Sequence, residues 1–140
     1  MNPPSPPRGV SAIERHYLDY IAVLNERRFA ELAAFVADEL VYNDASMSAR
    51  QYRQLLEDDV RRIPDLFFDV RQLVADGDQV AARLRFDCTP ALTFHGLEPT
   101  GSRVVFHEHV MYRFEDERIA KVWSLLDIAA LQVQLTRGTI

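Results

Sequence analysis

Residues 93–127 read TFHGLEPTGSR, VVFHEHVMYRF, EDER and IAKVWSLLD in succession, and this stretch predicts a loop followed by a long β-hairpin. Both expected strands are rich in β-branched and aromatic residues, and a short charged turn separates them. Because side chains alternate along a strand, one face would carry Phe106, Glu108, Val110 and Tyr112. A carboxylate among apolar neighbours is costly unless the face borders a wet pocket, so we expect the function to lie on this hairpin.

The size and composition of the chain indicate one globular domain. It has 140 residues, of which 48% are hydrophobic, in the range expected for a single core. No apolar run could span a bilayer, and the start, MNPPSPPRGV, does not resemble a secretory signal, so we expect a cytoplasmic protein. Its single cysteine, Cys88, excludes an intrachain disulfide. A net charge of −5 with scattered basic residues argues against nucleic acid or a membrane surface as a partner.

Signals for helices come first along the chain, and signals for strands follow. Ser11 and Glu14 form a capping box that would open the first helix. After a disordered proline-rich segment at 1–10, we expect helices from 11, near 29–36 and at 48–62, with a short strand at 41–42 that a turn closes. Four further strands are expected at 66–74, 79–88, 104–114 and 119–127. The chain would end in a short helix at 128–135 and a fraying tail at 137–140.

This order predicts an α+β fold formed by residues 11–136. Three N-terminal helices would pack on a curved, mainly antiparallel sheet and form a cone-shaped α+β barrel. The hollow between the helices and the sheet is the default ligand site.

The order of elements and the sequence from Gly96 to Asp127 resemble the SnoaL-like (polyketide cyclase-related) branch of the nuclear transport factor 2-like superfamily. Such proteins carry a Gly-(Leu/Ile/Met)-x-Pro-Thr-Gly loop, a strand ending in Arg-Phe, an Asp-Gly-Lys-Ile turn and a Trp-x-x-x-Asp motif at the end of the following strand. The counterparts here are residues 96–101, 113–114, 116–119 and 123–127. Glu117 stands where glycine is usual, which leaves the turn geometry open. The resemblance implies the cone-shaped fold and a small hydrophobic ligand, but the fold hosts isomerases, dehydratases, hydrolases, cyclases and non-catalytic binders.

The resemblance implies candidate residues from two of these chemistries. Polyketide cyclases use an acid on the last strand, where this chain has Ser124. Ketosteroid isomerases use a tyrosine on the first helix and an aspartate base after the first strand, and Tyr20 and Asp44 match those places. Their second acid would fall at Val110, which cannot donate a proton.

A third chemistry, that of limonene-epoxide hydrolases, is also matched in part. Arg85-Phe86-Asp87 resembles their Arg-x-Asp pair, and Tyr42 matches their tyrosine. Asp44 and Ser124 replace their asparagine and last-strand aspartate. Arg85 and Asp87 share one face of a strand whose other face is apolar, so an exposed or subunit-contacting pair is the alternative to a pocket pair.

Each candidate has a structural alternative. Asp44 could be a buried base, or part of a good turn sequence. Tyr20 could hydrogen-bond an oxyanion, or be a core aromatic. Glu108 could be a second carboxylate in the pocket beside Tyr112, or a solvated charge. We expect Tyr42, Arg85, Asp87, Val110, Tyr112 and Ser124 to form the binding set around the catalytic candidates Asp44, Tyr20 and Glu108.

His107 and His109 would point away from the pocket. Their spacing suits two metal ligands, with His95 as a third, but we favour a homodimer contact through the outer sheet face, where Met111 and Trp123 add apolar area. We therefore expect no metal and no organic cofactor. The leading hypothesis is a SnoaL-like enzyme of the cyclase or isomerase type; a non-catalytic binder and an epoxide hydrolase-like enzyme are the alternatives.

Overall fold

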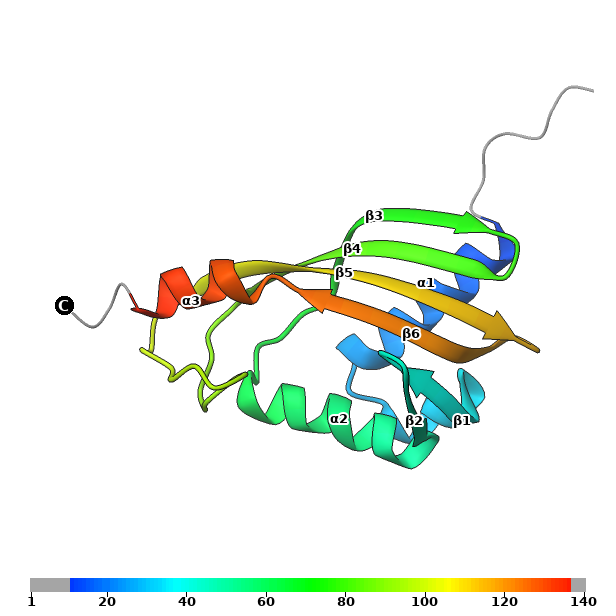
Figure 1. Cartoon of the computed structure of the whole chain (residues 1–140), viewed down its shortest axis with the longest axis horizontal. Helices are drawn as coiled ribbons and strands as arrows, with labels where there is room; N and C mark the ends of the chain where they lie inside the picture. The colour runs from blue at the N-terminus through cyan, green and yellow to red at the C-terminus, as the bar shows by residue number, and fades with distance from the viewer. Residues whose placement is uncertain (1–10, 137–140) are drawn as a thin grey trace, which may run out of the picture.

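A curved six-stranded sheet with helices against its concave face forms the framework of the protein (Figure 1). The computed structural model describes residues 11–136, so the expectations for residues 1–10 and 137–140 lie outside the described residues. The elements in chain order are α1 (Ala12–Asn25), the 3₁₀ helix η1 (Phe29–Ala34), β1 (Val36–Tyr42), β2 (Ala45–Ser48), α2 (Ala49–Arg62), β3 (Asp69–Asp76), β4 (Gln79–Cys88), β5 (Val104–Glu115), β6 (Arg118–Leu126) and α3 (Ile128–Thr136).

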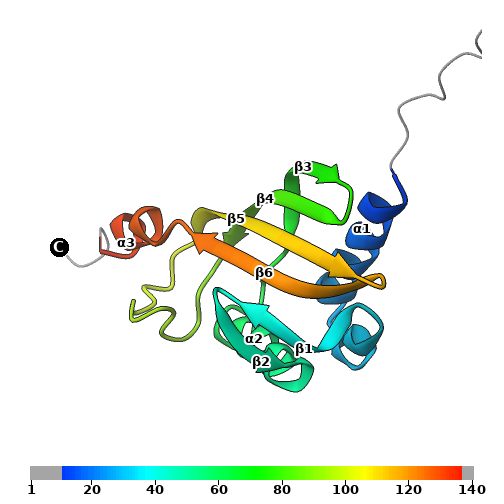
Figure 2. The same ribbon diagram turned by 45° about the vertical axis from the view of Figure 1, so that its right-hand side comes forward.

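The sheet has the order β2-β1-β6-β5-β4-β3 and is mixed. Its neighbours are antiparallel except β1 and β6, which run parallel. The predicted α+β cone, with three N-terminal helical segments and a mainly antiparallel sheet, is confirmed. The sheet stays open, because β2 and β3 lie at opposite edges. Figures 1 and 2 show α1 and α2 on one side of the sheet and α3 beyond the end of β6.

Two local expectations were wrong, and the second helix, which forms where it was expected, is of another type. The turn at Asn43–Asp44 does not end the first strand region but connects β1 to β2, because both residues adopt a left-handed backbone (φ 47° and 69°) that suits a two-residue hairpin. The second helix is a short 3₁₀ segment. Strand β3 begins at Asp69 rather than Leu66, because the Asn25 side chain binds both backbone groups of Phe68, at 2.7 Å and 3.1 Å, in place of a strand neighbour.

The turn between β5 and β6 keeps the geometry of a glycine-containing turn. Asp116 and Glu117 have φ values of 50° and 64°, so Glu117 adopts the left-handed conformation in which glycine is favoured. The hairpin predicted from the sequence therefore forms, with Glu108 opposite Leu126 and Glu115 opposite Arg118.

The apolar core lies between the helices and the concave face of the sheet. Its largest fully buried side chains include Tyr17, Tyr20, Phe106, Leu24 and Leu40. Strand β4 alternates strictly between a buried face with Leu84 and Phe86 and a half-exposed face. No helix in residues 11–136 combines the length and apolarity needed to cross a membrane.

Candidate functional site

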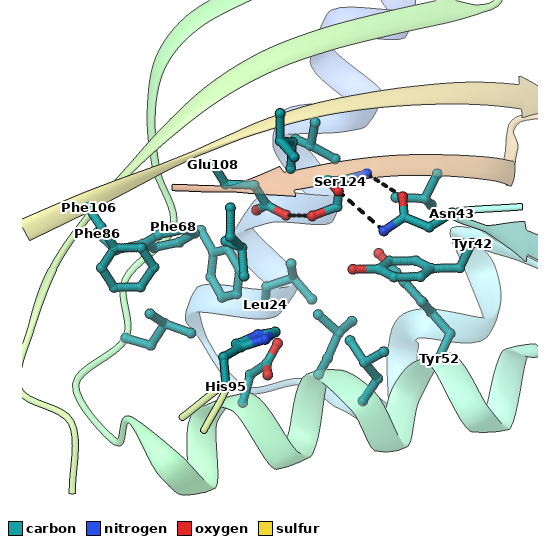
Figure 3. A pocket seen from close by; sticks show the side chains of 18 of the residues that line it. Leu24, Tyr42, Asn43, Tyr52, Phe68, Phe86, His95, Phe106, Glu108 and Ser124 are labelled. Carbon is teal, nitrogen blue, oxygen red and sulfur yellow. Dashed lines mark hydrogen bonds between the residues drawn. The ribbon is translucent and has the colours of Figure 1, made fainter. Parts of the chain in front are cut away.

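A cavity of about 380 Å³ opens between α2 and the concave face of the sheet. Strand β5 contributes Phe106, Glu108, Val110 and Tyr112 to its wall, as the alternation of side chains predicted. The wall also includes Tyr20, Tyr42 and Ser124 from the predicted set. Figure 3 shows Glu108 and Ser124 on the sheet side of this cavity and His95 on the side of α2.

Glu108 is the carboxylate of the sheet wall, and its position depends on the neighbouring strand. The Ser124 hydroxyl on β6 donates a hydrogen bond to the Glu108 carboxylate (Figure 3). The Asn43 side chain in turn binds both backbone groups of Ser124, accepting from its N–H at 2.8 Å and donating to its carbonyl at 3.2 Å. Burial raises the pKa of Glu108, and the Ser124 hydrogen bond opposes this rise. A carboxylate with a raised pKa is suited to proton transfer near neutral pH.

The tyrosines of the chain gather beside this carboxylate. All five, Tyr17, Tyr20, Tyr42, Tyr52 and Tyr112, contact another member of the group, and four of them line the cavity. The hydroxyl oxygens of Tyr20 and Tyr52 lie 2.6 Å apart. Burial raises the pKa of each of these phenols, so they stay protonated and act as hydrogen-bond donors.

Asp59 on α2 is a second carboxyl group in the cavity, and our sequence reasoning did not find it. Burial raises its pKa to about 7, and the nearby charge of Glu108 adds to the rise. The sequence did contain a signal. Asp59 falls on the apolar stripe of the helix, seven residues after Tyr52 and four before Ile63, both of which are buried.

The other end of the cavity is aromatic and is bordered by an ordered loop. Phe68, Phe86, Phe94 and Phe106 line it, with their rings in contact. His95 also lines this end, on a two-residue turn in which its φ is 50°. The Arg62 side chain holds the loop through the Thr93 carbonyl at 2.6 Å. Burial, followed by the charge of Arg62, lowers the pKa of His95.

Comparison with known proteins assigns the family. The sequence profile described as SnoaL-like polyketide cyclase matches residues 14–135, which is most of the chain. The chain belongs to the SnoaL-like polyketide cyclase family.

Solved structures of similar proteins agree with this assignment. A SnoaL-like polyketide cyclase from Agrobacterium tumefaciens str. C58 is 43% identical, with a TM-score of 0.86, over 89% of this chain and 98% of that chain. AclR from Streptomyces galilaeus is 25% identical, with a TM-score of 0.76, over 92% of this chain and 98% of that chain. A protein from Acidithiobacillus ferrooxidans, 19% identical with a TM-score of 0.80 over 91% of this chain and 96% of that chain, shares the fold. The comparison with curated proteins found no match.

Asp44 does not lie in the cavity of this SnoaL-like protein. We expected a buried base at this position, but Asp44 occupies the exposed turn between β1 and β2. The preceding residues Tyr42 and Asn43 line the cavity instead. The left-handed backbone at residues 43 and 44 explains the error, because it turns the chain back into β2 before Asp44 can reach the interior.

Arg85 and Asp87 also lie outside the SnoaL-like cavity, on the outer face of β4. Their side chains are 35% and 32% exposed and 3.8 Å apart, and Asp87 also pairs with Arg103. The pocket role predicted for them is therefore wrong. The strict alternation of β4 turns Leu84 and Phe86 to the interior, where Phe86 lines the cavity. The epoxide hydrolase-like hypothesis therefore loses the pair that it required.

The three histidines considered as metal ligands do not converge. His107 and His109 lie on the outer face of β5, opposite Arg85 and Arg83 on β4, while His95 faces the cavity on the other side of the sheet. Among residues 11–136, no three His, Cys, Asp or Glu side chains form a group that could hold a metal ion.

Proposed function

We propose that this SnoaL-like protein binds a small hydrophobic ketone in the cavity and catalyses proton transfer next to its carbonyl group. This reaction belongs to the polyketide cyclase or isomerase type, and in this proposal it uses only side chains that face the cavity. The observation that carries the proposal is the Glu108 carboxylate, set in an apolar cavity with a raised pKa and flanked by tyrosine hydroxyls.

In this proposal Glu108 is the general base. It would remove a proton from the carbon beside the carbonyl, and the electrons of that C–H bond would form the enolate. The Ser124 hydroxyl fixes one carboxylate oxygen and leaves the other for the substrate. The Tyr20–Tyr52 pair would hydrogen-bond the oxygen on which negative charge develops, with hydroxyls already positioned by their mutual contact.

Solvent deuterium exchange provides a test that needs no knowledge of the natural substrate. The bicyclic ketone 2-tetralone, incubated in D₂O with the protein, should exchange its α-protons faster than in buffer alone. Glu108→Gln, which keeps the shape but not the basicity, should slow the catalysed exchange by about 100-fold or more. Asp44→Asn, in the exposed turn, should leave the rate unchanged. Exchange at the wild-type rate in Glu108→Gln would refute the role of Glu108.

A non-catalytic binder is the second candidate function, and the lining supports it as well. Most residues around the cavity are apolar, and the Glu108 carboxylate already accepts a hydrogen bond from Ser124. This reading predicts saturable binding of the ketone, measured by calorimetry, with no exchange above buffer. The same experiment thus separates the two functions.

We also propose that the outer face of the sheet joins two copies of the chain. Val74, Ala81, Met111 and Trp123 form one row in register across β3, β4, β5 and β6. In this row Val74, Met111 and Trp123 are 65%, 49% and 37% exposed. Arg83 and His109 border the row on one side, and Arg113 and Lys121 on the other. An apolar centre with a polar rim is typical of a protein interface.

A further inference from the structure

Asp59 interrupts the apolar stripe by which α2 packs on the rest of the protein. Tyr52, Leu56 and Ile63 on that stripe are buried. Asp59 follows Leu56 by three residues and precedes Ile63 by four, so helical geometry turns its side chain toward the same interior. A leucine at this position would add to the core, whereas a carboxylate there is costly.

The nearby arginines offset only part of this cost, because their side chains are bound to other groups. The adjacent Asp58 takes both nearby arginines, with Arg61 at 2.6 Å and Arg62 at 2.8 Å. Arg62 also donates a hydrogen bond to the Thr93 carbonyl at 2.6 Å. Within residues 11–136 we find no hydrogen bond or salt bridge made by the Asp59 carboxyl group, which lines the cavity instead. An ionisable group held in a cleft without a structural partner is a candidate functional group.

The titratable groups that share the cavity with this carboxyl group come from several elements. Glu108 lies on β5, Tyr42 on β1 and His95 on the loop before β5, and all three line the same cavity. Asp58 and Arg62 flank it on its own helix, and their charges act on it in opposite directions. Glu108 is the group on the sheet that acts on it most strongly. Two carboxyl groups in one apolar cavity cannot both ionise cheaply, so the ionised form of one favours the protonated form of the other.

We propose that Asp59 is a catalytic residue that shares one proton with Glu108 and donates it to the carbonyl oxygen of the bound ketone. This inference rests on the proposed function. As Glu108 takes the α-proton, the C–H electrons form the carbon–carbon double bond, and the carbonyl π electrons take the proton from Asp59. The ketone becomes an enol, Glu108 becomes the acid and Asp59 the carboxylate. The pair carries one negative charge before and after the step.

The tyrosines could not supply this proton as readily. Burial raises the pKa of the Tyr20 and Tyr52 phenols, so they donate hydrogen bonds but release a proton poorly. A carboxylic acid whose pKa lies near neutrality is a far better donor. The cavity thus separates two tasks: the phenols stabilise charge on the oxygen, and Asp59 delivers the proton.

Carboxyl ¹³C NMR of protein labelled at aspartate and glutamate tests the shared proton without any ligand. Asp59 should titrate near neutral pH in the wild type, and its pKa should fall in Glu108→Gln because the neighbouring charge is gone. Asp58 should titrate in the ordinary acidic range or below in both proteins, which makes it an internal control. Titration of Asp59 alongside Asp58 in the wild type, or an unchanged Asp59 pKa in Glu108→Gln, would overturn the proposal.

The 2-tetralone exchange assay then tests catalysis. Asp59→Asn should slow the catalysed exchange by about 100-fold, while the matched variant Asp58→Asn on the same helix should exchange normally. Asp59→Leu should also lose activity although it restores the apolar stripe, which separates a catalytic loss from a folding defect. Wild-type exchange rates in Asp59→Asn would overturn the catalytic role of Asp59 alone. If the wild-type protein fails to accelerate exchange, the proposed function and the donor role both fall, whereas the NMR titration still decides the shared proton.

Discussion

The hydroxyl oxygens of Tyr20 on α1 and Tyr52 on α2 lie 2.6 Å apart, although 32 positions separate the two residues in the chain. Both side chains are buried, and each ring packs on another tyrosine. The hydrogen bond joins two helices at the wall of the cavity. It therefore contributes to stability and also sets the direction in which a phenol can donate to a ligand.

Removal of one hydroxyl of this pair should lower the free energy of unfolding by more than the loss of the hydrogen bond alone. Tyr52→Phe should lower the free energy of unfolding by about 1–3 kcal/mol, because the Tyr20 hydroxyl loses its partner in a buried place. Urea denaturation measures this change. The double variant Tyr20→Phe/Tyr52→Phe should lose less than the sum of the single variants, since it leaves no orphaned hydroxyl. Strict additivity would show that the two groups do not interact.

Glu117 should be replaceable by glycine with a gain in stability. Its φ of 64° is unfavourable for a residue with a Cβ atom but natural for glycine. Glu117→Gly should raise the free energy of unfolding by roughly 0.5–1 kcal/mol, measured by thermal or urea unfolding. Glu115→Gly, two residues earlier in strand β5, should instead be destabilising, because glycine weakens a strand. A loss of stability in Glu117→Gly would contradict the strain argument.

Stability should fall as pH rises toward neutrality, and Asp59 should be a main cause. The folded state raises the pKa of Asp59 from 3.8 to about 7, so between these values it binds more protons than the unfolded state. The contribution of Asp59 to the free energy of unfolding is complete below about pH 4 and is lost as pH rises through 7, with a total on the order of 4 kcal/mol. The raised pKa of Glu108 makes stability depend on pH in the same direction.

The measurement is the free energy of unfolding as a function of pH. Asp59→Asn should flatten the curve over this range. Asp58→Asn should keep most of the slope, because burial and Glu108 raise the pKa of Asp59 more than Asp58 does, and the arginines beside Asp58 lower its own pKa. An identical slope in Asp59→Asn and the wild type would exclude Asp59 as its source.

The attachment of the C-terminal helix α3 to strand β5 should depend on the side chain of one glutamine. The Gln134 side chain accepts from the Val105 N–H at 2.7 Å and donates to the Val105 carbonyl at 2.6 Å, which fixes α3 to β5 beyond the end of β6. Gln134→Ala should increase hydrogen exchange in α3, and Ile128 at the cavity wall should share this mobility. The exposed neighbour Gln132 provides the control, since Gln132→Ala should leave exchange unchanged. Equal protection in both variants would contradict the anchoring role.

The outer face of the sheet should control the oligomeric state. Trp123→Glu places a charge in the centre of the proposed interface and should shift a dimer to a monomer, detected by light scattering. Leu18→Glu on α1 is the matched control, because Leu18 and Trp123 are both 37% exposed. A wild-type protein that is monomeric at high concentration would rule out this interface.

Local patterns in the sequence were sufficient to predict strands β4, β5 and β6 and the face of the sheet that bears the site. Alternation along residues 104–114 placed Glu108, Val110 and Tyr112 on one wall, and the structure agrees. The capping signal at Ser11 and the boundaries of β4 also agree. These features depend on residues close together in the chain, so the alternation of side chains along a strand and the cap of a helix could be predicted directly from the sequence.

The identity of the second carboxyl group required the tertiary structure. The resemblance to ketosteroid isomerases pointed to Asp44, and Asp59 was not among the candidates. The left-handed turn at residues 43–44 left Asp44 exposed, while the packing of α2 across the sheet placed Asp59 in the cavity with Glu108. Which groups meet across a cavity depends on how elements distant in sequence pack, and burial by those same elements sets their pKa values, so neither could follow from local pattern alone.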